Sequence, residues 1–356
     1  MHSLRKTDLC IIIMAAVLSS TVIGFVSANF AFAKNNGTEQ QLITDFTGFH
    51  SNIEQIKGHI EMAAFNKFFN ETNNTLGHTL HPIEEVLSLV TIPLASTAGE
   101  LNGTFYNNLF QLSTLASQNS TLDEFENHSL SSLALSDRVI TAVVPTNLLS
   151  TTEHNVSVIK DLLTVSAAEY AEGVSNGTII MELEYQDGSA FVNRAYSIFN
   201  NTENISNDTG VITQLLTDFS NLTDSVSNLK DPAVINNLIT KINNALPSSN
   251  GTNVTNNESY EDYVSNIRNL LSEVEIAYQN NDKLKATELA TAAYLDNFEF
   301  LEAIIGPESS DRGESLLREK LRQQINGNAT IDEIKQNIAE INSVLDEATK
   351  ALNSNT

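Results

Sequence analysis

The sequence predicts an all-α protein made of tandem antiparallel helical bundles, with units of the four-helix-bundle type. Apolar residues recur at steps of three and four along most of the chain, which is the spacing of a helix with one buried face. Polar turns separate these runs, and we find neither a β-hairpin signal nor a repeat of fixed period. The first predicted helix is long, and its apolar positions are Leu42, Phe46, Phe49, Ile53, Ile56, Ile60 and Ala63.

Residues 1–33 have the pattern of a secretory signal peptide. Arg5 and Lys6 precede an apolar run over residues 9–26, and Ala31-Phe32-Ala33 supplies the small-x-small site expected before Lys34. The prediction is therefore an extracytoplasmic protein, secreted or at the cell surface. The apolar run is also just long enough to span a bilayer, so the alternative is an uncleaved N-terminal membrane anchor.

The remaining chain divides by composition into four parts. We expect an N-terminal bundle with a histidine cluster over residues 34–140, a middle helical segment over 141–246, a polar linker over 247–259 and a C-terminal four-helix bundle over 260–353. The linker reads PSSNGTNVTNNES and has little to bury. In front of the last helix, Thr330 and Glu333 have the spacing of a capping box.

Net charge narrows the choice of partners. The chain carries a formal charge of -25, of which residues 1–33 contribute +1 (Arg5 and Lys6 against Asp8), leaving -26 for the mature protein. So acidic a chain is a poor partner for nucleic acid or anionic lipid and a good one for cations. The alternative is that the acidity only keeps an exported protein soluble.

Asn-x-Ser/Thr sequons are dense, which predicts N-glycans on surface loops if the host glycosylates them. Examples occur at Asn36, Asn70, Asn102, Asn155, Asn176, Asn207, Asn253 and Asn328.

Motifs for nucleophilic catalysis are missing from the sequence. It contains no G-x-S-x-G elbow, no H-E-x-x-H pair, no phosphate-binding glycine loop and no dinucleotide fingerprint. The only cysteine, Cys10, lies in the predicted signal peptide, which excludes thiolate chemistry and disulfides from the mature chain. We therefore expect a binding protein and no enzyme.

A carboxylate rib near the C-terminus is the first candidate metal site. In an otherwise apolar stretch, acidic residues recur at steps of three, at Asp296, Glu299 and Glu302. On a helix these three side chains fall on one face that spans about 120°. Carboxylates with apolar neighbours are one way to bind a hard cation. The alternative is a core helix with an ordinary acidic outer edge.

A histidine constellation is the second candidate. If the helix extends back through them, one sector would hold His78, His81 and Glu85, with His59 and Glu61 on the preceding helix as partners. Imidazole plus carboxylate suits a divalent transition metal. Two observations favour solvent-facing histidines instead. Pro82 is placed to open a new helix, which would leave His78 in a turn, and the sector points away from the apolar stripe.

The third candidate flanks a turn at residues 176–177. This cluster offers hard oxygen ligands fit for a trivalent cation, and its members are Glu169, Tyr170, Glu172, Glu182, Glu184 and Tyr185. Within it, Glu169, Tyr170 and Glu184 are the ligands that we favour. The alternative is that Tyr170 and Tyr185 pack with the hydroxyl at the surface and that the glutamates are ordinary helix-end residues. Gly177 suits the left-handed residue that follows a helix end.

Two stretches resemble a known family. EYAEGVSNGTIIMELEYQDGSAFV (169–192) and EVEIAYQNNDKLKATELATAAYLDNFEFLEAII (273–305) are similar to the extracytoplasmic helical domain of high-affinity iron permeases. The resemblance implies an exported helical module that works in iron uptake beside a membrane permease. It does not imply transport, because the membrane helices and their Arg-Glu-x-x-Glu motif are missing; residues 318–322 read REKLR.

The leading hypothesis is an exported protein that binds or presents iron ions, associated with the membrane through a permease. The second is a structural or interaction module of the cell envelope in which no metal binds. A third is an imelysin-like helical protein that binds haem or another ligand between its helices. Iron titration separates the first two, and haem absorbance tests the third.

Overall fold

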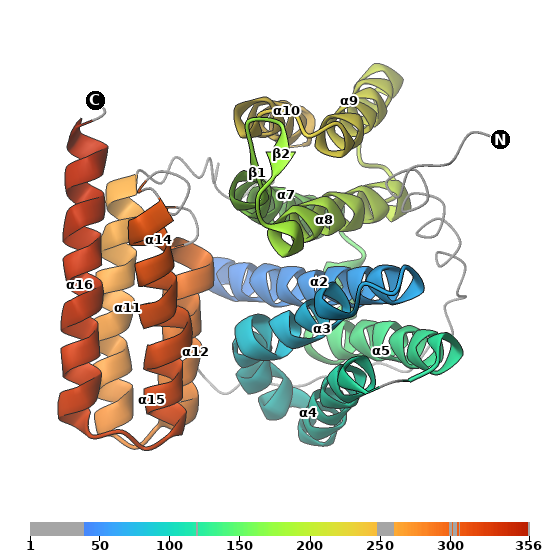
Figure 1. Cartoon of the computed structure of the whole chain (residues 1–356). Helices are drawn as coiled ribbons and strands as arrows, with labels where there is room; N and C mark the ends of the chain where they lie inside the picture. Colours follow the sequence, from blue (N-terminus) through green and yellow to red (C-terminus); the bar gives the residue numbers. More distant parts are fainter. Residues whose placement is uncertain are drawn as a thin grey trace. The chain divides into compact units, whose positions relative to one another are not determined.

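The computed structural model describes residues 39–118, 120–247, 260–298, 301, 305 and 307–354. These residues are almost entirely helical (Figure 1), which confirms the all-α prediction. The predicted signal peptide with Cys10 lies outside the described residues, as do Asn36, Asn253 and all of the predicted linker except Pro247. Among the helices that are described, none combines the length and the apolar character needed to cross a bilayer.

The chain folds into two compact units. The first comprises residues 1–83 and 93–251, and the second comprises residues 84–92 and 252–356. The helices that we assigned to separate N-terminal and middle segments share the first unit. The reason is that one long helix, α2 (Glu39–Phe68), packs against partners from both segments.

The first unit is built from long helices that follow one another through short connections. They are α3 (Thr72–His81), η1 (Pro82–Val86), α4 (Leu87–Ser117), α5 (Leu122–Val143), α6 (Thr146–Leu149), α7 (Thr152–Gly173), α8 (Glu182–Asn201), α9 (Thr209–Ser227) and α10 (Pro232–Ala245), with η1 and the start of α4 grouped with the second unit. Helix α2 lies between the α7–α8 pair on one side and α3 and α5 on the other (Figure 1). Helices α9 and α10 cover the far side of the α7–α8 pair.

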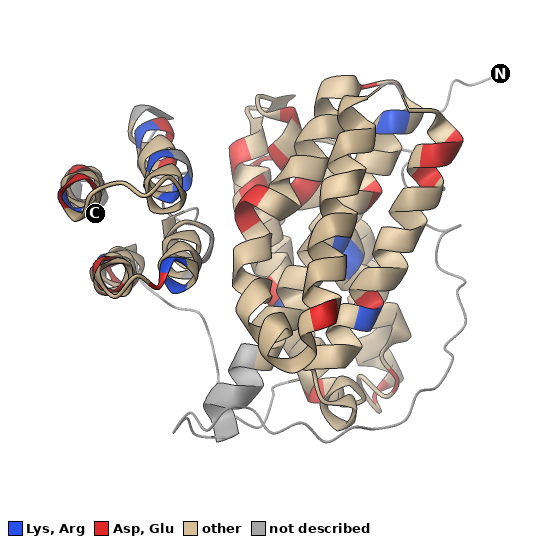
Figure 2. Cartoon of the chain, turned by 90° about the horizontal axis from the view of Figure 1, so that it is seen from below, with Lys and Arg blue, Asp and Glu red and all other residues tan. Residues whose placement is uncertain are grey.

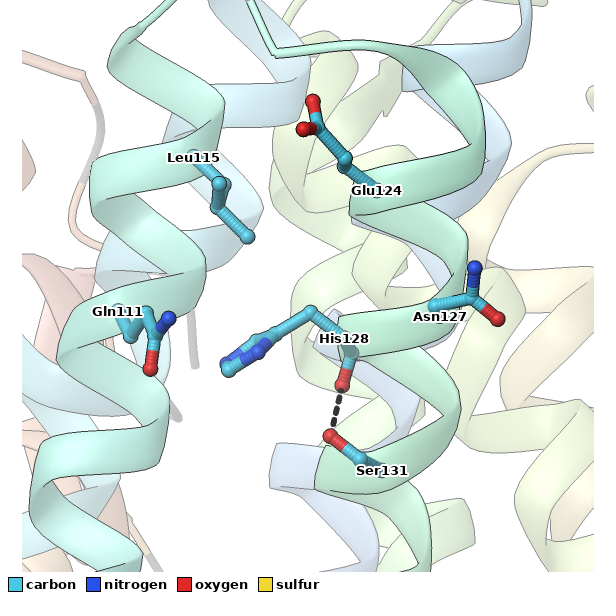
Figure 3. A pocket seen from close by; sticks show the side chains of 6 residues that line it. All are labelled: Gln111, Leu115, Glu124, Asn127, His128 and Ser131. Atoms are coloured by element: carbon cyan, nitrogen blue, oxygen red, sulfur yellow. Dashed lines mark hydrogen bonds between the residues drawn. The ribbon is translucent and has the colours of Figure 1, made fainter.

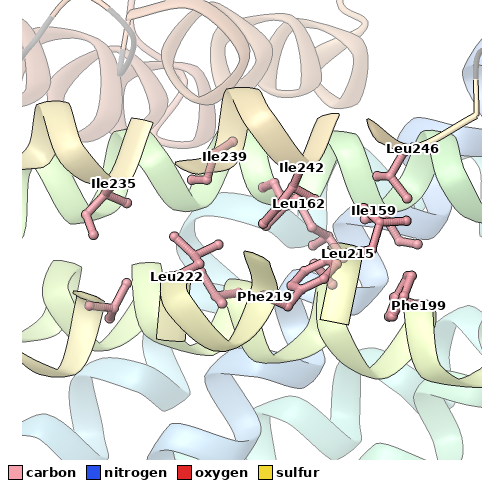
Figure 4. Packing of buried hydrophobic residues seen from close by; sticks show 14 of the residues in the cluster. Ile159, Leu162, Phe199, Leu215, Phe219, Leu222, Ile235, Ile239, Ile242 and Leu246 are labelled. Atoms are coloured by element: carbon pink, nitrogen blue, oxygen red, sulfur yellow. The ribbon is translucent and has the colours of Figure 1, made fainter. Parts of the chain in front are cut away.

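Helices α7 to α10 enclose an apolar core. Phe219 and Leu222 of α9 face Ile239 of α10 across this core (Figure 4), and all three side chains are buried. The sequence explains the arrangement, because α9 and α10 each carry apolar residues at steps of three and four on a single face. Asp231 caps α10, and Pro232 occupies its first turn, where no intrahelical N–H bond is lost.

A short hairpin joins α7 to α8. Strands β1 (Val174–Ser175) and β2 (Thr178–Ile179) pair antiparallel, and both turn residues have positive φ, 52° at Asn176 and 71° at Gly177. Asn-Gly is the sequence preferred for such a two-residue turn. Our expectation of no hairpin was wrong here, because we interpreted Asn176–Gly177 only as the end of a helix.

The backbone around Pro82 also differs from expectation. Helix α3 runs through His78 to His81, and Pro82 begins the π-helical turn η1 instead of a new helix. The wider π turn accommodates a residue that lacks the N–H an α-helix would use. His78 is therefore helical and does not lie in a turn.

The second unit contains α11 (Tyr260–Gln279), α12 (Lys283–Ala293), η2 (Tyr294–Phe298), α14 (Pro307–Glu314), η3 (Ser315–Leu321), α15 (Arg322–Asn326) and α16 (Ile331–Ser354). The predicted capping box is present before α16. Thr330 N donates to Glu333 Oε2 at 2.7 Å, and Glu333 N donates to Thr330 Oγ1 at 3.3 Å. Asp and Glu are scattered over the helices of both units, with fewer Lys and Arg among them (Figure 2).

Candidate metal centre

Four buried side chains from three helices converge inside the first unit. His59 comes from α2, His78 and His81 come from α3, and Asp187 comes from α8. Each can offer one ligand atom such that all four atoms lie within 4.8 Å of one another. None of the four residues is more than 6% exposed. The expectation of solvent-facing histidines was therefore wrong, because the polar face of α3 packs into the unit against α2 and α8.

Asp187 stands at the centre of the three imidazoles. Its Oδ1 lies 2.8 Å from His59 Nδ1 and 3.1 Å from His78 Nδ1, and its Oδ2 lies 3.0 Å from His81 Nδ1. The two Oδ1 contacts do not have the geometry of hydrogen bonds, since Oδ1 and both ring nitrogens remain buried without a hydrogen-bond partner. A cation site requires ligand atoms that converge on one point and are not already used in hydrogen bonds with one another.

The protonation of His78 can be inferred from its other nitrogen. The Gln186 amide donates through Nε2 to Glu182 Oε1 at 3.3 Å, which directs its Oε1 toward Asn66 Nδ2 (2.6 Å) and His78 Nε2 (2.7 Å). An amide oxygen only accepts, so His78 Nε2 carries a proton. In the neutral ring Nδ1 then presents a lone pair toward Asp187 Oδ1. A cation placed between those two atoms removes the repulsion, and Gln186 orients the ring as outer partners of metal-binding histidines do.

Electrostatics favour an ionised Asp187. Burial alone would raise the pKa of this carboxyl, but His59 and His78, when their rings carry a positive charge, hold the pKa well below its usual range. The centre thus offers a carboxylate and three imidazoles, a donor set that suits divalent first-row transition metals.

Close helix packing brings these side chains together. A Cβ added to Gly77 would approach Leu183 Cδ1 to 2.8 Å, and one added to Gly188 would approach the backbone N of Tyr170 to 2.9 Å. Gly58 occupies the same kind of position between α2 and α8. A side chain at Gly188 would meet the backbone of α7, whereas side chains at Gly77 and Gly58 would displace the side chains of Leu183 and Phe191. Each of these glycines is adjacent in sequence to a candidate ligand.

A second group of carboxylates adjoins the first and shares Asp187 with it. Glu169 of α7 and Glu184 of α8 can each bring an oxygen within 4.8 Å of an Asp187 oxygen, and both glutamates are half-buried. The third predicted ligand, Tyr170, is turned away. Its side chain is fully buried in the apolar core, and its hydroxyl donates to Lys230 O at 2.7 Å.

A buried ion-pair network lies further along the same side of α8. Arg194 donates from Nε to Glu54 Oε2 at 2.8 Å and from Nη1 to Glu61 Oε1 at 2.9 Å. Burial alone would raise the pKa of Glu54, but the charges of Arg194 and Lys57 hold it well below its usual range. Burial raises the pKa of Glu61 despite its contact with Arg194. This network is already satisfied by its own ion pairs and joins α2 to α8.

Other residues that we considered as ligands lie elsewhere. Glu85 belongs to the second unit, where its carboxylate pairs with Arg318, and its place beside His78 and His81 stays a prediction. Asp296 is in η2, but its side chain is outside what the structure describes, and Glu299 and Glu302 lie outside the described residues. The carboxylate rib therefore stays a prediction.

Asp187, the residue that connects both groups, was not among the ligands predicted from the sequence. One signal was present, because Glu184 and Asp187 are three apart and therefore share a face of α8. The other was the pairing of candidate ligands with neighbouring glycines, Gly58-His59, Gly77-His78 and Asp187-Gly188.

A surface pocket between α4 and α5 offers a contrast. It is lined by polar side chains around His128 (Figure 3), whose Nε2 contacts Asn108 O at 2.9 Å. His128 belongs to neither ligand group found among the described residues. It serves below as a control histidine.

Comparison with known proteins gives one match. The family model of the iron permease-associated 4-helix bundle domain matches residues 145–253. Searches of curated proteins and of solved structures returned no significant match. The matched residues include the stretch 169–192, whereas 273–305 lies outside them, and the more distant imelysin-like resemblance stays a prediction. The family resemblance is confirmed for the segment that contains α6 to α10, and residues 145–253 are similar to the iron permease-associated 4-helix bundle domain.

Proposed function

We propose that this protein is an exported metal-binding protein that works beside a membrane iron permease, and that it binds an iron ion through His59, His78, His81 and Asp187. The observation that supports this most is the convergence of three buried imidazoles on one buried carboxylate with unsatisfied facing atoms. A buried set of this kind is costly to leave without a cation, because each unsatisfied polar atom loses its hydration.

The ligand chemistry and the matched domain together point to ferrous iron. Three imidazoles and one carboxylate bind divalent first-row metals in general, and geometry and supply decide among them. The domain to which residues 145–253 are similar is described as iron permease-associated, which favours iron over zinc or copper. The net charge of -25 favours the approach of any cation.

The role that we propose is binding and presentation, without catalysis. In this role all four side chains, the carboxylate included, act as ligands. The matched domain supports a membrane permease as partner, and the sequons support the proposal of N-glycans on an exported chain.

The test is anaerobic titration with ferrous iron. The double variant His59→Gln/His81→Gln keeps polar side chains of similar size but removes two nitrogen ligands. We expect its iron affinity to fall at least about 100-fold, equivalent to about 2.7 kcal/mol. His128→Gln is the matched control and should bind as the wild type does.

Two outcomes would contradict the proposal. If the double variant binds iron as tightly as the wild type while Glu299→Gln/Glu302→Gln weakens binding, the carboxylate rib is the site. If the wild type binds no iron at all, the interaction module of the cell envelope becomes the better description. Haem absorbance of the purified protein tests the imelysin-like alternative in the same preparation.

A further inference from the structure

The two ligand groups are not separate sites, because both include Asp187. The inner group adds three buried histidines, and the outer group adds the half-buried Glu169 and Glu184. A carboxylate has two oxygens and about four lone-pair directions, so a single Asp187 can serve two cations at once. Carboxylate bridging of this kind places two cations about 3.5–4 Å apart in known two-metal sites.

Asp187 itself supplies evidence beyond the clustering of acids. The residue is 1% exposed, and its Oδ1, which lies 2.8 Å from His59 Nδ1, is buried without a hydrogen-bond partner. The close approach of α7 and α8 at Gly188, where Ser166 Oγ donates to Gly188 O at 2.7 Å, fixes Asp187 beside α7, the helix that carries Glu169. The packing that holds Asp187 in the inner group therefore also holds it in the outer group.

The two positions differ in chemistry and exposure. Imidazole nitrogens dominate the inner position, which is buried, whereas the outer position offers only carboxylate oxygens on half-buried side chains. Oxygen-only sets prefer hard cations, and nitrogen-rich sets prefer the softer divalent transition metals.

We propose that Glu169, Glu184 and Asp187 form a second, outer position for a hard cation, joined to the inner histidine position through the shared Asp187 carboxylate. This inference rests on the proposed function, since it assumes that the inner position binds metal. The chain then has a centre for two cations, and its outer, half-buried position is selective for hard ions.

Terbium is a suitable probe, because it is a hard trivalent cation whose emission is sensitised by nearby tyrosine. Tyr170 and Tyr185 follow Glu169 and Glu184 in the chain, and their ring centroids are 6.2 Å apart. With the inner position first filled by zinc, we expect the wild type to bind one terbium tightly, with emission excited through tyrosine and no release of zinc.

The variant Glu169→Gln/Glu184→Gln should bind terbium at least about tenfold more weakly while retaining its zinc. Glu184→Gln alone tests the same point with a smaller change, in case the double variant folds poorly by circular dichroism. Glu172→Gln is the matched control, since Glu172 is a half-buried glutamate of α7 outside both ligand groups.

Unchanged terbium affinity in the double variant would overturn the second position. Displacement of zinc by terbium mole for mole would do so too, because it would mean that only one position exists. A wild type that binds neither zinc nor ferrous iron would instead refute the proposed function, so the two failures are distinguishable.

Discussion

The two sides of helix α8 are buried against different kinds of interior. On one side Val192, Ala195 and Phe199 pack into the apolar core that α7 to α10 enclose. On the other side Asp187 and Arg194 face α2 and are just as buried, but they meet histidines and carboxylates. Burial alone therefore does not identify a hydrophobic core.

The comparison shows two ways in which a helix interface is specified. In the apolar interior, stability comes from the area removed from water and from dense packing, and it depends little on which apolar side chain is present. In the polar interior, each buried charge requires its own partner, and removal of one partner leaves the other uncompensated. The first interface tolerates exchange between apolar side chains of similar volume, whereas the second depends on pairs.

The largest expected effect is on the apolar side. Phe219 is 1% exposed and lies 5.1 Å from Phe199 between ring centroids. Phe219→Ala leaves a cavity, so the free energy of unfolding should fall by about 3–5 kcal/mol in urea denaturation. Iron affinity of the folded variant should be unchanged. A variant that is as stable as the wild type would show that α9 and α10 contribute little to the unit.

On the polar side, Arg194→Met should cost about 3 kcal/mol, because Glu54 is left buried with only Lys57 as a strong partner. A double variant distinguishes a loss of charge pairing from a loss of packing. Adding Glu54→Gln to that variant should restore part of the loss, since the uncompensated charge is gone. The same urea titrations measure both. A further loss on adding Glu54→Gln would mean that the network is held by packing and not by charge.

A smaller expected effect is a fall in the free energy of unfolding at acid pH. His154 of α7 contacts His50 Nδ1 through its Nε2 at 2.9 Å, and burial, with a contribution from the charge of His50, lowers the pKa of His154 to about 3. The unfolded chain binds this proton below about pH 6.5 and the folded chain does not, so stability is lost as pH falls from 6.5 toward 3. At pH 5 the loss should be about 2 kcal/mol relative to neutral pH.

His154→Gln removes this proton, so the difference in unfolding free energy between pH 7 and pH 5 should shrink by about the same amount. Urea denaturation of wild type and variant at both pH values measures it. An unchanged difference would mean that other groups determine the acid response.

The fold could be predicted because helix periodicity is a local signal. Apolar residues recur at steps of three and four along α2, α9 and α10 because one face of each helix packs against other apolar side chains. This spacing can be recognised within the sequence of each helix alone. The hairpin at Asn176–Gly177 was missed for the opposite reason, since two-residue strands give no periodicity and only the turn dipeptide marks them.

The candidate site could be predicted only in pieces. His78, His81, Glu169 and Glu184 were recognised as separate sets because each set is close in sequence, and His59 was noted as a partner. Asp187 joins them only in three dimensions. The pairing of Glu85 with Arg318 was missed because it spans more than two hundred residues, which no local pattern records.

The distance along the chain between the site residues also has a consequence for thermodynamics. His81 and Asp187 are 106 positions apart, so a cation bound to both closes a very large loop. Such a cation acts as a removable cross-link, in a chain whose single cysteine lies in the predicted signal peptide. Exported proteins commonly obtain this constraint from disulfides, which restrict the unfolded chain. Here a metal would restrict it instead, and the constraint would depend on the supply of that metal.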